Sequence, residues 1–363
     1  MPAIPRLLSL DALRGIAVVL MMEQHLGVWL WAADPLRGPI AQAPVLMALN
    51  GLGGLAAPTF ITLAGAGTAL LSRGRAGDLD LTLARRGLCV FGFGALLNLL
   101  TPSWFSAGSW FVLHLMGLGI ATTPLWRRLP TAGLLAGQAL LLLAAPFVQH
   151  WLNTPEVLFN DRMRRLDLPG GALRIAFAEG QFPIVPWLGL FLGGIAVGRW
   201  LRDGRRDLLA RLCATLLASG LVLAALGVLS HRVPALAFLR AAPWWRLVQI
   251  RLGFYPGNPS ILLLLQSATL LLLLGGLALE RRGHLSRGGP LVGLGRASLT
   301  LLLVHVVLFR ELSRPLGAWQ AFSPGVSLAI IAVWIALCAV AARAWQRIDY
   351  RYGAEWLLRK VGG

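Results

Sequence analysis

Long apolar stretches separated by short polar links make up almost the whole chain. Several of these stretches exceed the roughly 18 residues that mark a membrane-spanning helix. The pattern predicts an all-α, polytopic transmembrane helical bundle, formed by a single domain over residues 1–363. We count about ten spans, at 10–31, 46–72, 86–101, 109–126, 130–149, 183–201, 208–230, 258–280, 291–311 and 324–346.

The composition supports this interpretation. Hydrophobic residues make up 57% of the chain and charged residues only 13%, whereas soluble domains carry about 25% charged residues. The net charge of +18 comes almost wholly from arginine, in short links beside the spans. Basic residues in such links determine membrane topology, so we expect no nucleic-acid partner. The three cysteines are scattered and indicate neither a disulfide framework nor a metal site.

The distribution of basic residues indicates the orientation. With ten spans, both termini lie on the same side of the membrane. About two thirds of the 33 basic residues fall in the links and termini on that side. Because cytoplasmic links are enriched in Lys and Arg, we expect both termini in the cytoplasm. We expect a multi-pass protein of the inner (cytoplasmic) cell membrane, surrounded by membrane lipid. The sequence leaves a monomer and a homodimer both open.

The first predicted span contains side chains that hydrocarbon tolerates poorly, since a charge at the bilayer centre costs about 3 kcal/mol on insertion scales. They are Asp11, Arg14, Glu23 and His25. At about 100° per residue, Asp11, Arg14 and His25 fall along one stripe of the helix. Glu23 points elsewhere, so we expect this helix to be enclosed on more than one side. His25 lies about 16 Å from Arg14, in the outer half of the membrane. These charges also argue against a cleaved export signal.

Two predicted spans begin with proline and continue with small residues. The span 46–72 contains Pro58 and then Ala64-Gly65-Ala66-Gly67. The span 183–201 contains Pro183, Pro186, Gly189, Gly193, Gly194 and Gly198. Small residues at this spacing let helix backbones approach closely, so we interpret the glycines mainly as packing positions.

The longest links are 150–182 and 231–257. Their charged and aromatic side chains include Arg174, Glu179, Trp244, Trp245 and Arg246. Mixed charge is typical of a solvated loop, and Trp at such a depth is typical of the membrane interface. The alternatives are that the first link caps a cavity or binds substrate, and that the second docks an outside polymer.

Five short segments resemble motifs of one protein superfamily. They are Arg6-x-x-Ser9-Leu10-Asp11-Ala12-Leu13-Arg14-Gly15 with His25, Ala57-Pro58-Thr59-Phe60-Ile61-Thr62-Leu63-Ala64-Gly65, Phe182-Pro183-Ile184-Val185-Pro186-Trp187-Leu188-Gly189, Leu294-Gly295-Arg296-Ala297-Ser298-Leu299 with His305, and Tyr352-Gly353-Ala354-Glu355-Trp356-Leu357-Leu358-Arg359. Together, and in this order along nearly the whole chain, they resemble the membrane acyltransferase superfamily. This group includes acyltransferase family three and the heparan-α-glucosaminide N-acetyltransferase-like proteins.

The resemblance implies an acyl-CoA donor, with acetyl-CoA as the expected form, held from the cytoplasmic side. It implies an extracytoplasmic sugar or glycan acceptor, acylated on a hydroxyl or an amine, and no metal. His25 would be the catalytic histidine, and Arg14 would anchor the donor or organise its tunnel. The heparan enzyme places its own histidine just before an Asn-Gly pair, whereas Asn50-Gly51 here follows a stretch without histidine. The chemistry therefore falls to His25, with His305 or His114 as substitutes.

Acyl transfer also suggests roles for the remaining polar residues. It needs a base for the acceptor and a hydrogen-bond donor for the developing oxyanion, and the reference pKa of histidine, near 6.5, suits the base. We expect donor contacts from Asp11, Arg14 and Arg296, although Asp11 and Arg14 could equally form a salt bridge at the helix start. Substrate or oxyanion contacts are expected from Asn50, Thr59, Glu23 and Ser298. For Glu23 we leave open a histidine or an arginine such as Arg310 as its partner, and His25 itself could be a hydrogen-bonded structural residue.

Three functions remain open from the sequence. The first is a membrane-bound acyltransferase with His25 as general base, the second is a transporter or flippase whose intramembrane charges line a path, and the third is a non-catalytic relative. The stripe from Asp11 to His25 favours the acyltransferase. So does the lack of evident inverted repeats, which many transporters contain.

Overall fold

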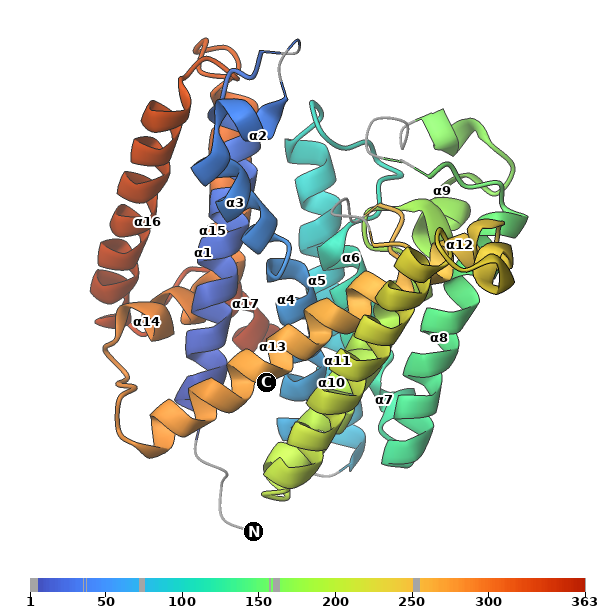
Figure 1. Ribbon diagram of the computed structural model, residues 1–363. Helices are drawn as coiled ribbons and strands as arrows, with labels where there is room; N and C mark the ends of the chain where they lie inside the picture. Colours follow the sequence, from blue (N-terminus) through green and yellow to red (C-terminus); the bar gives the residue numbers. More distant parts are fainter. Residues whose placement is uncertain are drawn as a thin grey trace.

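The computed structural model describes residues 6–34, 36, 38–71, 76–156, 158, 164–250 and 255–362. These residues fold into helices, and their one β-type pairing is an isolated bridge between Trp31 and Phe322, so the predicted all-α class is confirmed. The elements labelled in Figure 1, with the short ones between them, are α1 (Leu8–Leu30), α2 (Pro39–Gln42), α3 (Pro44–Gly53), α4 (Ala56–Leu70), α5 (Ala76–Leu100), α6 (Val112–Ala121), α7 (Thr123–Trp126), α8 (Thr131–Trp151), η1 (Arg164–Asp167), α9 (Gly171–Arg174), η2 (Ile175–Glu179), α10 (Ile184–Arg202), α11 (Arg206–Leu229), η3 (Pro234–Arg240), α12 (Trp244–Val248), α13 (Pro259–Arg281), α14 (Pro290–Arg296), α15 (Ser298–Val306), η4 (Val307–Leu312), α16 (Pro324–Gln346) and α17 (Ala354–Val361).

The chain is a multi-pass membrane protein. Within the described ranges, seven segments are long and apolar enough to cross a membrane: Pro44–Leu70, Asp78–Leu100, Thr131–Trp151, Ile184–Arg202, Arg206–Leu229, Pro259–Arg281 and Pro324–Gln346. An eighth results if α14 and Ser298–Leu312, which meet at a bend of 74°, form one broken span. The count of ten and the cytoplasmic position of both termini stay predictions.

Two of the predicted spans fall outside this set. The span 10–31 corresponds to α1, whose 23 residues reach about 35 Å but include the charged side chains. The span 109–126 is wrong as one continuous helix, because the chain forms α6, of 10 residues, followed by α7. Pro124 at the start of α7 lacks a backbone N–H, and the Thr122 hydroxyl donates to the Leu118 carbonyl at 2.7 Å. Both features end α6 early.

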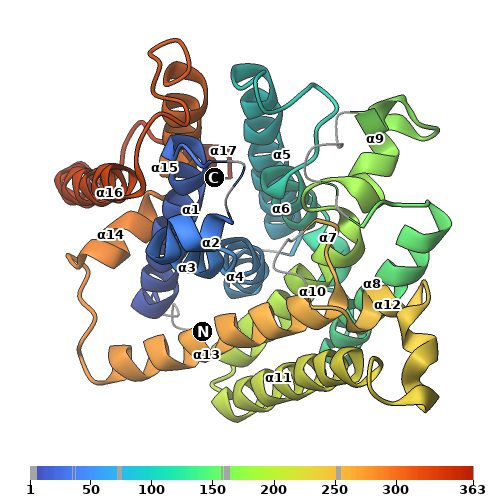
Figure 2. The same cartoon turned by 45° about the horizontal axis from the view of Figure 1, so that its top comes forward.

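Other helices surround α1 on several sides. Figures 1 and 2 show it between α16 and α14 on one side and α4 and α13 on the other, and it also contacts α3 and α15. Most of its residues are buried, including Asp11 and Glu23. The prediction that this helix is enclosed on more than one side is confirmed, and this enclosure allows a membrane helix to carry ionisable side chains.

The predicted glycine packing is also confirmed, between α4 and α10. A Cβ atom on Gly65 would lie 2.2 Å from the Phe191 carbonyl oxygen, and one on Gly194 would lie 2.2 Å from the Thr62 oxygen. One turn further along α10, a Cβ on Gly198 would lie 2.3 Å from the oxygen of Ala66. The two backbones thus touch along a stripe that admits no side chain.

A second backbone contact joins the first motif to the late one. A Cβ atom on Gly15 would lie 2.0 Å from the Leu291 carbonyl oxygen, and one on Gly295 would lie 1.8 Å from the Asp11 oxygen. Helix α14 therefore crosses α1 at van der Waals distance. Since α15 continues from α14, this contact sets where the later histidine meets α1.

Distant carboxylates cap the starts of two helices. Glu280, at the end of α13, accepts from the backbone N–H groups of Leu8 and Ser9 at 2.7 and 3.0 Å. Glu355, in α17, accepts from the N–H groups of Leu299 and Thr300 at 2.6 and 3.2 Å. Helix N-termini leave such N–H groups without partners and favour negative charge. The C-terminal motif thus stabilises α15 just after the bend.

Candidate active site

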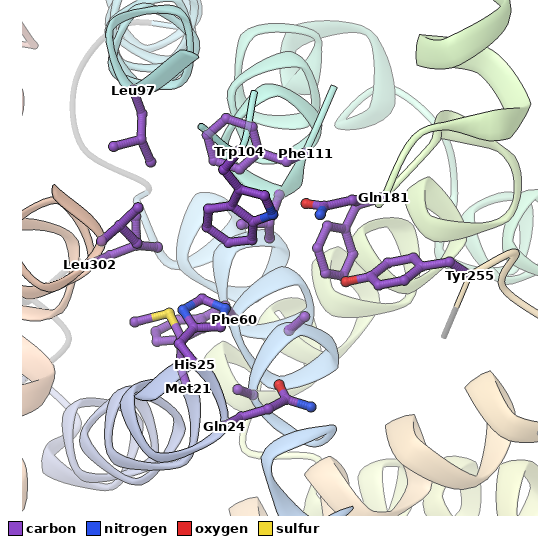
Figure 3. A pocket seen from close by; sticks show the side chains of 15 residues that line it. Met21, Gln24, His25, Phe60, Leu97, Trp104, Phe111, Gln181, Tyr255 and Leu302 are labelled. Atoms are coloured by element: carbon purple, nitrogen blue, oxygen red, sulfur yellow. The ribbon is translucent and has the colours of Figure 1, made fainter. Parts of the chain in front are cut away.

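A cavity of about 70 Å³ lies beside the part of α1 that carries His25. Its wall is mostly apolar and combines α1, α4, α5, α6 and α15 with the loops that hold Trp104, Gln181 and Tyr255 (Figure 3). The lining residues are Met21, Gln24, His25, Ala56, Ala57, Phe60, Leu97, Trp104, Phe111, Val112, Gln181, Phe182, Tyr255, Leu302 and Val306. The volume holds about five water molecules, so it fits the reacting ends of two substrates rather than a whole coenzyme.

Two histidines that are 280 positions apart in the chain meet at this cavity. The Nδ1 atom of His25 lies 2.9 Å from the Nε2 atom of His305, and their rings stack with centroids 5.2 Å apart. His305 is fully buried, and its Nδ1 atom lies 2.8 Å from the carbonyl oxygen of Leu301, one turn earlier in α15. His305 therefore contacts His25 directly, and it is not itself among the residues that line the cavity.

The contacts of this pair determine where the hydrogens lie when both rings are neutral. A carbonyl oxygen can only accept, so Nδ1 of His305 carries a hydrogen and donates to Leu301. The Nε2 atom of His305 is then an acceptor, and Nδ1 of His25 must donate to it. This leaves Nε2 of His25 with a free lone pair, on a ring that lines the cavity. The chain of donors fixes one tautomer, as in other histidine sites that use a second group for orientation.

Aromatic rings and one arginine enclose the histidine pair. Trp29 stacks on His25 at 4.9 Å, and Trp104 meets His25 edge-on at 5.4 Å. The guanidinium of Arg310, in η4, lies 5.7 Å from the Trp104 ring and 4.3 Å from the Trp319 ring. Sequence reasoning missed these tryptophans. The sequence could have placed Trp29 beside His25, because Trp29 follows it by four residues and so shares its helix face. Trp104 and Trp319 lie in loops, where no such spacing predicts a contact.

At the other end of α1, Asp11 joins two arginines. Arg6 contacts its carboxylate at 2.5 and 3.1 Å, and Arg14 approaches at 3.5 Å. The predicted Asp11–Arg14 pair therefore exists, with Arg6 as an added member. Partial desolvation acts to lower the pKa of Arg6, whose side chain is 54% exposed, but the hydrogen bond and charge of Asp11 outweigh it, and the pKa lies above its ordinary value. The side chain of Arg14 is 31% exposed, which leaves it accessible to an anionic group.

The family comparison covers the helices that build most of this site. A family model described as heparan-alpha-glucosaminide N-acetyltransferase, catalytic, matches residues 6–229, which is more than half of the 363 residues. The chain belongs to this acetyltransferase family. A comparison with curated proteins gives no match. The function is thus of the N-acetyltransferase type, and the family in general implies acetyl-CoA as the donor.

The region that matches the family model includes His25 but ends before His305. It also ends before Arg296 and Ser298, which the structure places away from the cavity. Arg296 donates to Asp349 at 2.9 Å and lies 4.5 Å over the Tyr350 ring. Ser298 is the first residue of α15. Both residues thus stand at the α14–α15 bend, and Arg296 holds the chain that follows α16.

The other predicted substrate residues also lie outside the cavity wall. The Thr59 hydroxyl pairs with that of Thr269 at 3.0 Å, in the interior. Asn50 packs its amide against Gly27 of α1, and its backbone oxygen accepts from Gln24 at 3.4 Å. The structure therefore brings together His25 and His305 but leaves Thr59 and Asn50 apart from them.

Glu23 and His114 are both buried. The two carboxylate oxygens of Glu23 have no hydrogen-bond partner among the described residues. Arg310, the partner considered for Glu23, donates instead to the Ser103 carbonyl at 2.9 Å. His114 accepts from the Phe111 N–H at 3.3 Å, as a packing residue at the start of α6. No group of three or more His, Cys, Asp or Glu side chains suited to a metal occurs in the described parts of the chain.

Proposed function

We propose that this protein transfers an acetyl group from acetyl-CoA, held on the cytoplasmic side, to an amine or hydroxyl of an extracytoplasmic sugar, with His25 as general base. The observation that carries the proposal is the hydrogen-bonded chain from the Leu301 carbonyl through His305 to His25. That chain presents a basic ring nitrogen at a small apolar cavity between membrane helices. The family model, whose description names a glucosaminide, supports an amino sugar as the acceptor.

The reaction would proceed by direct transfer. The acceptor nitrogen or oxygen attacks the thioester carbonyl carbon, and Nε2 of His25 takes the proton that the acceptor loses. The tetrahedral intermediate collapses with cleavage of the C–S bond, and the imidazolium of His25 returns the proton to the departing CoA thiolate. The Nε2 lone pair of His305 accepts from His25 throughout, which holds the ring in place and stabilises its charged form.

The donor would enter from the end of α1 that carries Arg14. Coenzyme A carries phosphate groups, and an arginine guanidinium binds phosphate through paired hydrogen bonds. Arg14 is partly exposed, and Asp11 holds it on one side. Since α1 separates Arg14 from His25 by about 16 Å, one helix would link a donor site on the cytoplasmic side to a reaction centre in the outer half. This arrangement requires the predicted topology, with both termini in the cytoplasm of the cell whose inner membrane holds the protein.

The test uses the purified full chain in lipid nanodiscs with acetyl-labelled acetyl-CoA and methyl α-glucosaminide. We expect labelled N-acetyl product and free CoA thiol from the wild type, and loss of about 10²- to 10⁴-fold in rate for His25→Ala. Arg14→Ala should raise the KM for acetyl-CoA. A wild type that neither binds acetyl-CoA nor releases CoA would overturn the proposal and favour a transporter. Unchanged turnover in His25→Ala would remove His25 as the base.

A further inference from the structure

The cavity wall opposite His25 carries two polar side chains that the mechanism above does not use. Figure 3 shows Gln181 and Tyr255 pointing into the cavity from the side away from His25, with the Tyr255 hydroxyl at the inner end of its ring. Gln181 is buried, whereas Tyr255 is partly exposed. They belong to the two long links, 150–182 and 231–257, so segments far apart in the sequence build one wall.

Gln181 is held by the backbone of the segment before α6. Its N–H donates to the Trp110 carbonyl at 3.1 Å, and the Trp110 indole donates to the Phe182 carbonyl at 2.9 Å. Gly180 allows this close approach, because a Cβ there would lie 2.7 Å from the Ile175 oxygen and 3.0 Å from the Trp110 oxygen. The backbone that presents the Gln181 side chain is therefore fixed on both sides.

A buried ion pair lies directly before Gln181. Glu179 is completely buried, and its carboxylate accepts from Arg174 Nε at 2.7 Å and from the Thr154 hydroxyl at 2.6 Å. Arg174 also donates to the Leu152 carbonyl. In the first link, the expectation of a solvated loop is thus wrong for Arg174 and Glu179, because the fold uses their opposite charges inside. Asp161 and Arg162 of the same link lie outside the described residues.

The same network continues into the second link. Arg246, also buried, donates to the Thr154 carbonyl and to the Gln149 side chain at 3.1 Å. Gln149 in turn donates to the Gly257 carbonyl at 3.0 Å, two residues after Tyr255. The chain of contacts from Glu179 to Gly257, which we call the loop clasp, therefore ties together the two backbone segments that carry Gln181 and Tyr255.

The free-energy cost of burying the charged groups of the loop clasp indicates its role. Removing ions from water is expensive, and a buried ion pair adds little net stability compared with apolar packing. What such a network provides, when its members are satisfied, is one defined geometry. Polar groups that fix the orientation of a ligand in an apolar cavity are usually few and well placed. The loop clasp meets this requirement for the two side chains that face His25.

We propose that Gln181 and Tyr255 bind the acceptor sugar, and that the loop clasp positions them. This inference rests on the proposed function. An amide offers both a donor and an acceptor, and a phenol offers a donor and an acceptor, which matches the hydroxyl groups of a sugar ring. With these two groups on one wall and His25 on the other, the edge of the sugar that enters the cavity is held with its reacting amine toward the basic nitrogen.

The experiment measures steady-state kinetics of the full chain in nanodiscs for Gln181→Leu and Tyr255→Phe, which keep side-chain size but lose the polar group. The acceptor is methyl α-glucosaminide, alongside its 3-, 4- and 6-deoxy derivatives. Each variant should raise the acceptor KM by about 3- to 10-fold, the effect of one neutral hydrogen bond, while the KM for acetyl-CoA stays the same. For at least one deoxy derivative, the penalty seen with the wild type should vanish in the variant. Asp167→Asn, exposed on the same link, is the matched control and should match the wild type.

Each other outcome would count against a stated part of this scheme. Variants that leave the acceptor KM unchanged, or that raise both KM values together, would overturn the assignment. A wild type that hydrolyses acetyl-CoA but does not acetylate the glucosaminide would also overturn it, because the pair would then not hold an amino sugar. A wild type that does not consume acetyl-CoA would instead refute the proposed function itself.

Discussion

Replacing His305 by phenylalanine tests the hydrogen-bonded chain that would make His25 a base. Phenylalanine keeps a ring of similar size in the fully buried site of His305 but removes the acceptor that faces Nδ1 of His25 at 2.9 Å. The His25 N–H then loses its partner in a buried position, which costs about 1–3 kcal/mol. If this cost appears in the transition state, where the ring becomes charged, the rate falls by about 5- to 150-fold, at 1.36 kcal/mol per factor of ten.

The effect should be smaller than that of removing the base and should not add to it. His25→Ala loses the whole contribution of general base catalysis, about 10²- to 10⁴-fold. Without the His25 ring, His305 has nothing to orient. The double variant should therefore be no slower than His25→Ala alone, as is typical of residues that act as a unit.

The assay is single-turnover transfer of labelled acetyl from acetyl-CoA to methyl α-glucosaminide, with thermal unfolding in detergent measured in parallel. His114→Phe provides a control for the loss of a buried histidine, since His114 contacts Phe111 and Trp110 rather than His25. Its turnover should stay within about twofold of the wild type, on the usual scale for substitutions outside a site. A His305→Phe variant with the wild-type rate would refute the reasoning. A double variant whose loss of rate is the product of the losses for His25→Ala and His305→Phe would refute it as well.

Three further predictions concern the contacts that hold the site. Gly295→Ala should lower the free energy of unfolding by about 3 kcal/mol or more, since its Cβ would overlap the backbone of α1. The control Gly275→Ala, in open space on α13, should raise the free energy of unfolding by about 0.5–1 kcal/mol. Thermal unfolding distinguishes the two variants, and equal effects would contradict the backbone contact. Glu355→Gln should lower stability by about 1 kcal/mol by weakening the cap of α15, and an unchanged melting temperature would contradict that role. Thr154→Val removes one hydrogen bond from the buried Glu179 carboxylate and should raise the KM for the acceptor more than that for acetyl-CoA, whereas equal changes in both KM values would argue against the loop clasp as a positioning device.

Several features of the site follow from local sequence and could be predicted. The stripe of Asp11, Arg14 and His25 depends only on helix geometry, and the structure keeps Asp11 beside Arg14 and places His25 at a cavity. The glycines of α4 and α10 pack backbone on backbone, as their spacing indicates. These predictions succeed because the direction of a side chain on a helix is set within a few residues.

Other expected site residues lie away from the cavity, because a polar side chain has more than one available partner in the fold. Thr59 was expected at the substrate, but a hydroxyl in a membrane interior needs a nearby partner, and Thr269 supplies it. Arg296 was expected at the donor, but the turn after α16 brings Asp349 to it. In both cases the residue type indicates a need for a hydrogen bond, and the sequence does not say which distant group meets that need.

The sequence by itself determined that this is a helical membrane protein and at which residues most of its helices lie. It also determined that one face of the first helix carries Asp11, Arg14 and His25. These properties depend on apolar length and helical period, which are local. Only the tertiary structure decided that His305 meets His25, that Glu280 and Glu355 cap helices far from them in the chain, and that two loops combine into the wall opposite His25. The reason is physical: a helix fixes which way its own side chains point, but the close backbone contacts of Gly15, Gly295 and their neighbours decide which helices those side chains face.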